Sequence, residues 1–140
     1  MRWMPRSERL RVVALDTNVV VRLLVGDDPA QTRKAERIFL EHVNGAGIFI
    51  SLVVLAELGW VLSAAYEWDR ATIHTRIQRL VRTRNVRVEE LELVESALDE
   101  YEAGKAQLTD YLILGVARAA SEALLTFDKK LARSPRVTLL

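Results

Sequence analysis

The stretch Val12-Val13-Ala14-Leu15-Asp16-Thr17-Asn18 places an apolar run directly before an acid and two residues that favour the start of a helix. A short run without polar residues is typical of a strand that is buried on both faces. Thr17 and Asn18 suit a helix start, because their side-chain oxygens can accept a hydrogen bond from a free backbone N–H. We therefore predict a buried strand over 12–15, a helix after it, and Asp16 at the carboxyl end of the strand.

Apolar runs alternate with amphipathic segments along the rest of the chain. Ile73, Ile77 and Leu80, for example, recur at the spacing of one helix face. Short apolar strands that alternate with helices indicate an α/β fold, a three-layer α/β/α sandwich with a short central parallel sheet. The predicted strands are 12–15, 48–50, 86–88, 123–126 and, at an edge, 137–140; the predicted helices are 19–25, 30–43, 52–66, 69–84, 91–101 and 108–120.

Length and composition narrow the class of protein. The 140 residues suit one domain, predicted over 11–140, after a loose N-terminal leader over 1–10. A hydrophobic content of 50% excludes disordered and low-complexity classes. With no cysteine there are no disulfides and no thiolate metal sites, and two histidines argue against a histidine-rich site. The net charge of +1 is not that of a strongly basic nucleic-acid coat.

We expect a cytoplasmic protein that has no membrane partner. The longest apolar stretch, around 48–65, is interrupted by Ser51, Glu57 and Ser63. It therefore falls short of the roughly 20 apolar residues that span a bilayer. The first ten residues lack the apolar run of a signal peptide.

Four acids lie at the ends of predicted strands or in predicted apolar helices. Asp16 and Asp128 follow predicted strands, so in a parallel sheet both lie toward the same edge. Asp110 opens an apolar helix, where the helix dipole alone would favour an acid. Glu57 lies in a helix that is apolar around nearly its whole circumference, so we predict a buried carboxylate that needs a cation, a hydrogen-bond cluster or a raised pKa, with an internal ion pair to an arginine as the structural alternative.

Each acid has a local explanation as a cap, a loop acid or an ion-pair partner, but together they favour a metal site. Carboxylates that converge repel one another unless cations lie between them. Oxygen ligands suit Mg²⁺ or Mn²⁺, and such ions assist the hydrolysis of phosphodiesters. The acidic quartet, as we call it, consists of Asp16, Glu57, Asp110 and Asp128.

The quartet and its surroundings resemble the acidic motifs of PIN domains. Asp16-Thr17-Asn18-Val19-Val20-Val21-Arg22-Leu23-Leu24, the helix around Glu57, Asp110 and Leu125-Thr126-Phe127-Asp128 follow one another in the order of those motifs. Over residues 11–140 the chain looks most like the VapC-type toxins of bacterial and archaeal toxin–antitoxin pairs. The resemblance implies a Mg²⁺- or Mn²⁺-dependent endoribonuclease that cuts RNA, a homodimer, and a small antitoxin that covers the site.

The resemblance also assigns roles to single residues. It implies that the acidic quartet binds the metal and is catalytic, and that Asn18 and Thr126 orient the acids. Many relatives carry a further acid and a small residue at the positions that are Gln107 and Tyr111 here. The chain therefore lacks that fifth carboxylate, and we expect Tyr111 to narrow or shape the pocket.

Other charged and aromatic residues have less specific interpretations. Arg76, Arg79 and Lys129 are candidate contacts for RNA phosphates, although a solvated helix face is the simpler explanation of the arginines. The acids between Glu89 and Glu102 are interpreted as an exposed helix face, with a second metal cluster as the alternative. His42 and His74 are expected at the surface.

Two alternatives to a nuclease stay open. The first is phosphotransfer through an aspartyl phosphate at Asp16, although no Gly-rich phosphate loop accompanies it. The second is a non-catalytic PIN-like module that only binds a partner protein. The helix around Glu57 is apolar enough to bury a second face, with Trp60 on it, against another subunit.

Overall fold

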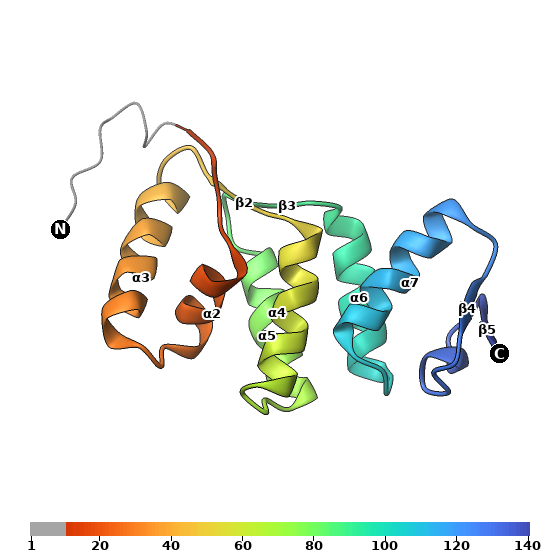
Figure 1. Ribbon diagram of the computed structural model, residues 1–140. Helices are drawn as coiled ribbons and strands as arrows, with labels where there is room; N and C mark the ends of the chain where they lie inside the picture. Colours follow the sequence, from red (N-terminus) through yellow and green to blue (C-terminus); the bar gives the residue numbers. More distant parts are fainter. Residues whose placement is uncertain (1–10) are drawn as a thin grey trace.

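The computed structural model describes residues 11–140, and the leader predicted over 1–10 lies outside the described residues. Three short strands, β1 (Val13–Ala14), β2 (Ile48–Ile50) and β3 (Val86–Val88), form a parallel sheet in the order β1-β2-β3 (Figure 1). Val13 pairs with Ile48, and Ile48 pairs with Val86. Because the strands are parallel, their carboxyl ends lie at one edge of the sheet, as the sequence predicts.

The connections between the strands are helical, which confirms the predicted α/β class. The observed bounds agree closely with the predicted ones. None of the described helices combines the length and the apolar character needed to cross a bilayer. The helices are α2 (Thr17–Val25), α3 (Pro29–Val43), α4 (Leu52–Ala64), α5 (Arg70–Val81), α6 (Leu91–Ala103) and α7 (Leu108–Ala120), followed by β4 (Leu124–Thr126), the 3₁₀ turn η1 (Leu131–Arg133) and β5 (Val137–Leu139).

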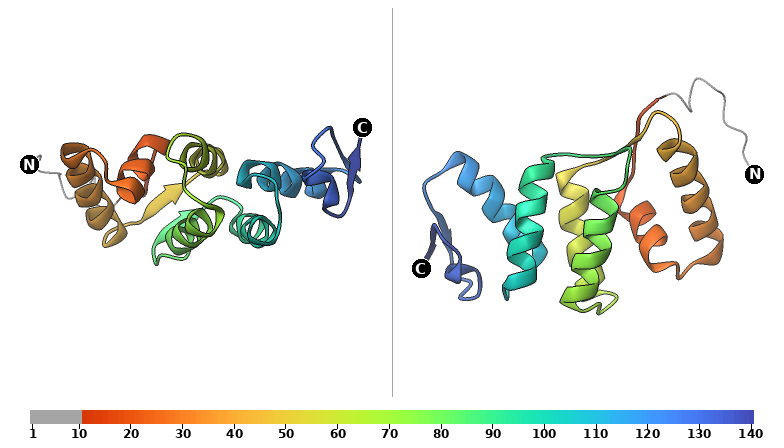
Figure 2. Two further views of the ribbon diagram at one scale, coloured as in Figure 1. Left: turned by 90° about the horizontal axis from the view of Figure 1, so that it is seen from below. Right: turned by 180° about the vertical axis from the view of Figure 1, so that it is seen from behind.

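The strands are divided between two sheets, which the sequence does not predict. β4 and β5 pair with each other in parallel and form a separate two-stranded sheet. Figures 1 and 2 show this sheet at the far end of the molecule, beyond α7. The guanidinium of Arg136 fastens it there, donating from Nη2 to the carbonyls of Arg118 and Ser121 at 3.1 and 2.6 Å. Apolar periodicity identifies a strand but not the strand with which it pairs.

Helix α4 is the central packing element. Its side chains Leu55, Leu58 and Leu62 are fully buried. Figures 1 and 2 show α4 and α5 in the middle of the molecule, between α2–α3 and α6–α7. Gly59 permits a close approach to α7, since a Cβ there would lie 3.1 Å from the Cβ of Leu108. The close contact brings the first turn of α7 beside the middle of α4.

Side-chain caps fix where the two central helices begin. Ser51 Oγ accepts a hydrogen bond from the backbone N–H of Val54 at 3.2 Å, at the start of α4. Asp69 Oδ1 accepts one from the backbone N–H of Thr72 at 2.8 Å, at the start of α5. Each cap satisfies a backbone donor that has no partner within its own helix.

The buried face of α4 should carry a large share of the stability. We expect Leu62→Ala to lower the free energy of unfolding by about 2–5 kcal/mol, because Leu62 is fully buried and its loss leaves a cavity. The matched control Leu40→Ala, on α3 with 59% of the side chain exposed, should change it by less than about 0.5 kcal/mol. Urea unfolding followed by circular dichroism measures both, and equal losses would contradict this packing.

The cap of α5 should weaken in acid. Hydrogen bonds from the side chain of Thr72 and, second, from its backbone hold the pKa of Asp69 below the ordinary value. A carboxyl with a lowered pKa stabilises the fold above its unfolded pKa, and this contribution is lost as the pH falls through the folded pKa. The stability advantage over Asp69→Asn should therefore be full near neutral pH and shrink below about pH 4. Urea midpoints of both proteins against pH test this, and a constant difference would refute it.

Candidate metal centre

Asp16 lies directly after β1, at the N-cap of α2. The ladder continues through Leu15, whose N–H donates to the carbonyl of Phe49 at 3.2 Å, so the backbone position of Asp16 is fixed by the sheet. Its side chain is exposed and, within the described part of the chain, accepts no capping hydrogen bond. The Asp16 carboxylate is therefore free to bind a ligand at the carboxyl end of β1.

Glu57 is held next to this position by Thr17. The hydroxyl of the buried Thr17 donates to Glu57 Oε1 at 3.2 Å and so joins the first residue of α2 to the middle of α4. Since Thr17 follows Asp16, the two acids lie on neighbouring elements at the same end of the sheet. The contact leaves Glu57 Oε2 available.

The predicted burial of Glu57 is wrong. The residue is exposed, and no ion pair with an arginine holds it in the described residues. With 3.6 residues per turn, Val53, Glu57 and Trp60 share the outer face of α4, opposite the buried leucines. An apolar composition all around a helix indicated burial on every side, but this outer face stays uncovered and Glu57 lies between two exposed apolar side chains.

Asp110 lies in the first turn of α7 and acts as a cap. Its Oδ2 accepts a hydrogen bond from the backbone N–H of Gln107 at 3.0 Å. The neighbouring Thr109 hydroxyl donates to the carbonyl of Ala56 at 2.9 Å, which docks this turn against α4 beside Glu57. Asp110 thus has the local role expected of an acid at a helix start, and it also comes from an element that contacts α4.

Tyr111 packs inside the protein. It is buried, its ring centroid lies 6.5 Å from that of Tyr101 at an interplanar angle of 66°, and its hydroxyl accepts from the N–H of Ala106 at 3.3 Å. These contacts hold α7 against α6. The bulky residue at this position therefore has a structural role at the helix interface.

Asp128 stands apart from the other three acids. It follows β4, and its Oδ1 accepts from the N–H groups of Lys130 and Leu131 at 2.8 and 3.3 Å. Thr126 Oγ1 accepts from the N–H of Asp128 at 3.0 Å, so Thr126 fixes the turn that carries the acid. Asp16, Glu57 and Asp110 belong to α2 with its N-cap, α4 and α7, and α4 contacts both of the other helices, whereas Asp128 follows a strand of the second sheet, which packs against α7. Among the residues described, no three of the quartet have carboxylate oxygens within 4.8 Å of one another.

The three basic residues considered as RNA contacts differ in whether other parts of the protein hold their side chains. Arg76 is half-buried, donates from Nη2 to the carbonyl of Leu24 at 2.9 Å, and lies 5.3 Å from the ring centroid of Trp68. Arg79 and Lys129 are exposed, and Lys129 directly follows Asp128. Arg76 therefore ties α5 to α2, while the other two side chains can reach a ligand.

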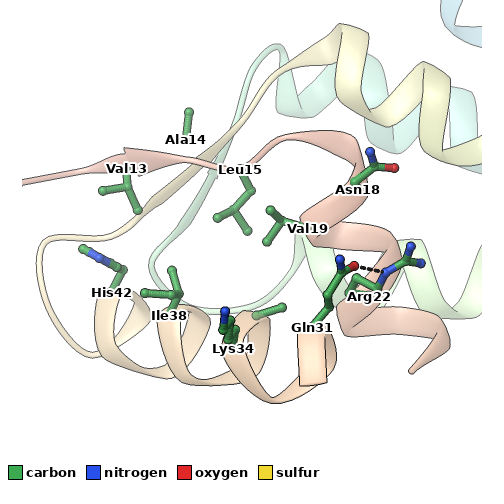
Figure 3. A pocket seen from close by; sticks show the side chains of 11 residues that line it. Val13, Ala14, Leu15, Asn18, Val19, Arg22, Gln31, Lys34, Ile38 and His42 are labelled. Atoms are coloured by element: carbon green, nitrogen blue, oxygen red, sulfur yellow. Dashed lines mark hydrogen bonds between the residues drawn. The ribbon is translucent and has the colours of Figure 1, made fainter. Parts of the chain in front are cut away.

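A cavity of about 460 Å³ lies between β1, α2 and α3 (Figure 3). Apolar side chains such as Val13 and Ile38 line it, and Asn18 borders it. Arg22 Nε donates to Gln31 Oε1 at 2.7 Å across its edge. No carboxylate belongs to the lining, so this cavity is not a site for the metal that the quartet would bind.

Both histidines are buried, which corrects the predicted surface positions. His42 is 1% and His74 7% exposed. His74 lies with Asp99 and Glu102 in the one group of three metal-capable side chains found among the described residues. Asp99 and Glu102 belong to the acids for which a second metal cluster was the alternative interpretation, but nothing in the sequence pointed to His74 as their neighbour, because it comes from another helix.

The sequence of the chain matches one family of known proteins. A family model described as PIN domain matches residues 13–137, from β1 to the first residue of β5. The matched span contains all four acids of the quartet. Among curated proteins, no relative matches the chain.

The cap at Asp110 can be separated from any role in metal binding. Asp110→Asn should keep an oxygen that accepts from Gln107 and lose only the charge, whereas Asp110→Ala should lose both and cost about 0.3–1.5 kcal/mol. We expect the alanine variant to be the less stable of the two in urea unfolding. Equal stability of the two variants and the parent protein would contradict the cap.

Proposed function

The chain belongs to the PIN domain family, and from this membership we propose that it is a metal-dependent endoribonuclease, the toxin component of a type II toxin–antitoxin pair. PIN domains are generally nucleases, and they typically depend on divalent metal ions. The observation that carries the proposal is the Thr17–Glu57 hydrogen bond, which holds Glu57 beside the free carboxylate of Asp16.

The residues present fit a hard divalent cation. The quartet offers only carboxylate oxygens, which Mg²⁺ and Mn²⁺ prefer. Asp16 has an uncapped carboxylate, Glu57 has one oxygen outside its bond to Thr17, and Asp110 has one oxygen outside its cap. In this proposal Asp16, Glu57, Asp110 and Asp128 hold Mg²⁺ or Mn²⁺. The inclusion of Asp128 rests on its motif, since its sheet lies apart from the other acids.

The proposed chemistry is hydrolysis of an RNA phosphodiester. A divalent ion bound at the quartet supplies activation of a water molecule and stabilisation of the charge that develops on the phosphate. Thr17 fixes the orientation of Glu57, and Thr126 fixes the turn of Asp128. Arg79 and Lys129 bind neighbouring phosphates, because their charges are exposed. Arg76 adds positive charge from a position that its bond to Leu24 holds fixed.

The outer face of α4 carries exposed apolar side chains that suit contacts with other proteins. Val53 and Trp60 are 67% and 57% exposed and lie on either side of Glu57. Exposed aromatic and aliphatic side chains of this kind are typical of protein interfaces. We propose that this face serves a homodimer contact, and that a cognate antitoxin covers the adjoining acids. We propose the cytoplasm as the place where the protein acts.

A non-catalytic binding module is the second candidate. Two acids of the quartet are used as caps, Asp110 at α7 and Asp128 at η1, and Asp128 lies on the separate sheet. If these acids only cap their helical turns and bind no metal, the exposed face of α4 would be the functional surface. Phosphotransfer through Asp16 has no comparable support in the geometry.

Cleavage of RNA by the purified chain decides between these functions. We expect cleavage in Mg²⁺ or Mn²⁺ that is lost on addition of a chelator. Asp16→Asn should lower the rate by at least about 100-fold without unfolding the protein, because its side chain makes no capping bond. The matched control Glu36→Gln, an exposed acid on α3, should cleave at the parent rate.

Two outcomes would overturn the nuclease proposal. The first is the absence of cleavage with either ion over a broad set of RNA substrates. The second is an Asp16→Asn variant that cleaves as fast as the parent, which would assign the activity to a contaminant. Binding of a partner protein by that variant with unchanged affinity, together with either outcome, would favour the binding module.

A further inference from the structure

Three metal-capable side chains meet on the side of the molecule where α5 packs against α6. His74 comes from α5, and Asp99 and Glu102 come from α6. One ligand atom from each lies within 4.8 Å of the other two. None of the three belongs to the acidic quartet or to the residues proposed to bind RNA.

The imidazole of His74 is buried and has no hydrogen-bond partner, although the Glu102 carboxylate lies at ion-pair distance. The side chain is 91% buried, given an exposed fraction of 9%, and Nε2 makes no hydrogen bond in the structure. Glu102 Oε2 lies only 3.2 Å from Nε2, but off the direction in which a ring N–H donates. A buried ring nitrogen that makes no hydrogen bond is unfavourable, so Nε2 is open to a group from outside the chain.

A metal ion accounts for the off-axis contact. Zn–N and Zn–O bonds are about 2.0–2.2 Å long, so adjacent ligand atoms of a tetrahedral site lie about 3.3–3.5 Å apart. The 3.2 Å between Nε2 and Oε2 is close to that separation. A direct hydrogen bond would need Oε2 to lie along the direction in which the Nε2–H bond points. A cation would instead lie along that direction itself, with Glu102 Oε2 beside it as the next ligand.

The local charge also favours a cation. Asp99 and Glu102 are three residues apart on one face of α6, where like charges repel. Neither forms an ion pair with a lysine or arginine within the described part of the chain. Arg70, four residues before His74 on α5, donates instead to the carbonyls of Tyr101 and Ala106, both at 2.8 Å.

We propose that His74, Asp99 and Glu102 form a second metal site that binds Zn²⁺ and fastens α5 to α6. A set of one imidazole and two carboxylates suits Zn²⁺, whereas Mg²⁺ favours oxygen ligands alone and keeps most of its waters. Water completes the coordination, because both acids are exposed. The site is structural and lies outside the catalytic set.

Calorimetry and thermal unfolding with ZnCl₂ test the site on the full, untagged chain. An Asp16→Asn background removes the quartet's first ligand and keeps the two sites separable. We expect one Zn²⁺ per chain and a rise of Tm with zinc concentration. Glu102→Gln should weaken zinc binding by at least about tenfold, since even groups that only orient a ligand are worth that much. Glu92→Gln, an exposed acid on the same helix, is the matched control and should bind zinc as the parent does.

Nuclear magnetic resonance of the imidazoles gives an independent readout. The chain has two histidines, so one variant assigns both signals. Zn²⁺ should shift the signals of His74 and leave those of His42 unchanged, and Mg²⁺ should shift neither. His74→Gln should abolish zinc binding; because it alters a buried residue, Asp99→Asn and Glu102→Gln, both at exposed positions, repeat the test if it fails to fold.

Several results would overturn the zinc site. They are the absence of a calorimetric signal with ZnCl₂, unchanged His74 signals, and a Glu102→Gln variant that binds zinc as tightly as the parent. RNA cleavage in Mg²⁺ or Mn²⁺ is measured separately with Glu102→Gln and should be retained. A protein that cleaves RNA but does not bind zinc refutes only this site, and one that binds zinc but cleaves no RNA refutes only the nuclease.

Discussion

Helix α4 can bury only one of its faces, and the arrangement of the acids depends on which face that is. Leu55, Leu58 and Leu62 fill the core, so geometry turns Glu57 outward. Thr17 meets it from α2, and Thr109 meets the same helix from α7. Hydrophobic packing of α4 thus sets the positions of the polar groups around Glu57.

The elements of the fold could be predicted from local pattern. Apolar strands such as Ile48–Ile50 and caps such as Ser51 and Asp69 depend on neighbouring residues alone, and the strand lies where the sequence predicts it. Pairing is not local. Nothing in the segment 124–126 indicates that it pairs with β5 in a separate sheet, because the hydrogen bonds of a strand edge are formed by the backbone and are the same for any sequence.

The position of a site residue could be predicted only where it follows from the secondary structure next to that residue in the sequence. The position of Asp16 follows from the end of its strand, but the exposure of Glu57 depends on which elements cover α4. The burial of His74 was not predicted for the same reason, since its carboxylate neighbours come from α6, the next helix along the chain, and not from α5. A histidine is judged from its own helix as a surface residue, while its burial and its carboxylate neighbours are properties of the packed pair of helices.

The side chain of Arg136 covers the carbonyls at the carboxyl end of α7, from a position more than a dozen residues further along the chain. Those carbonyls have no partners within the helix, so one guanidinium both caps α7 and sets the angle at which the chain leaves it. That angle also helps to set the position of the turn that carries Asp128, because this turn follows α7 along the chain. A substitution of Arg136 would consequently move the turn of Asp128 as well as the end of α7, although Arg136 lies outside the acidic quartet.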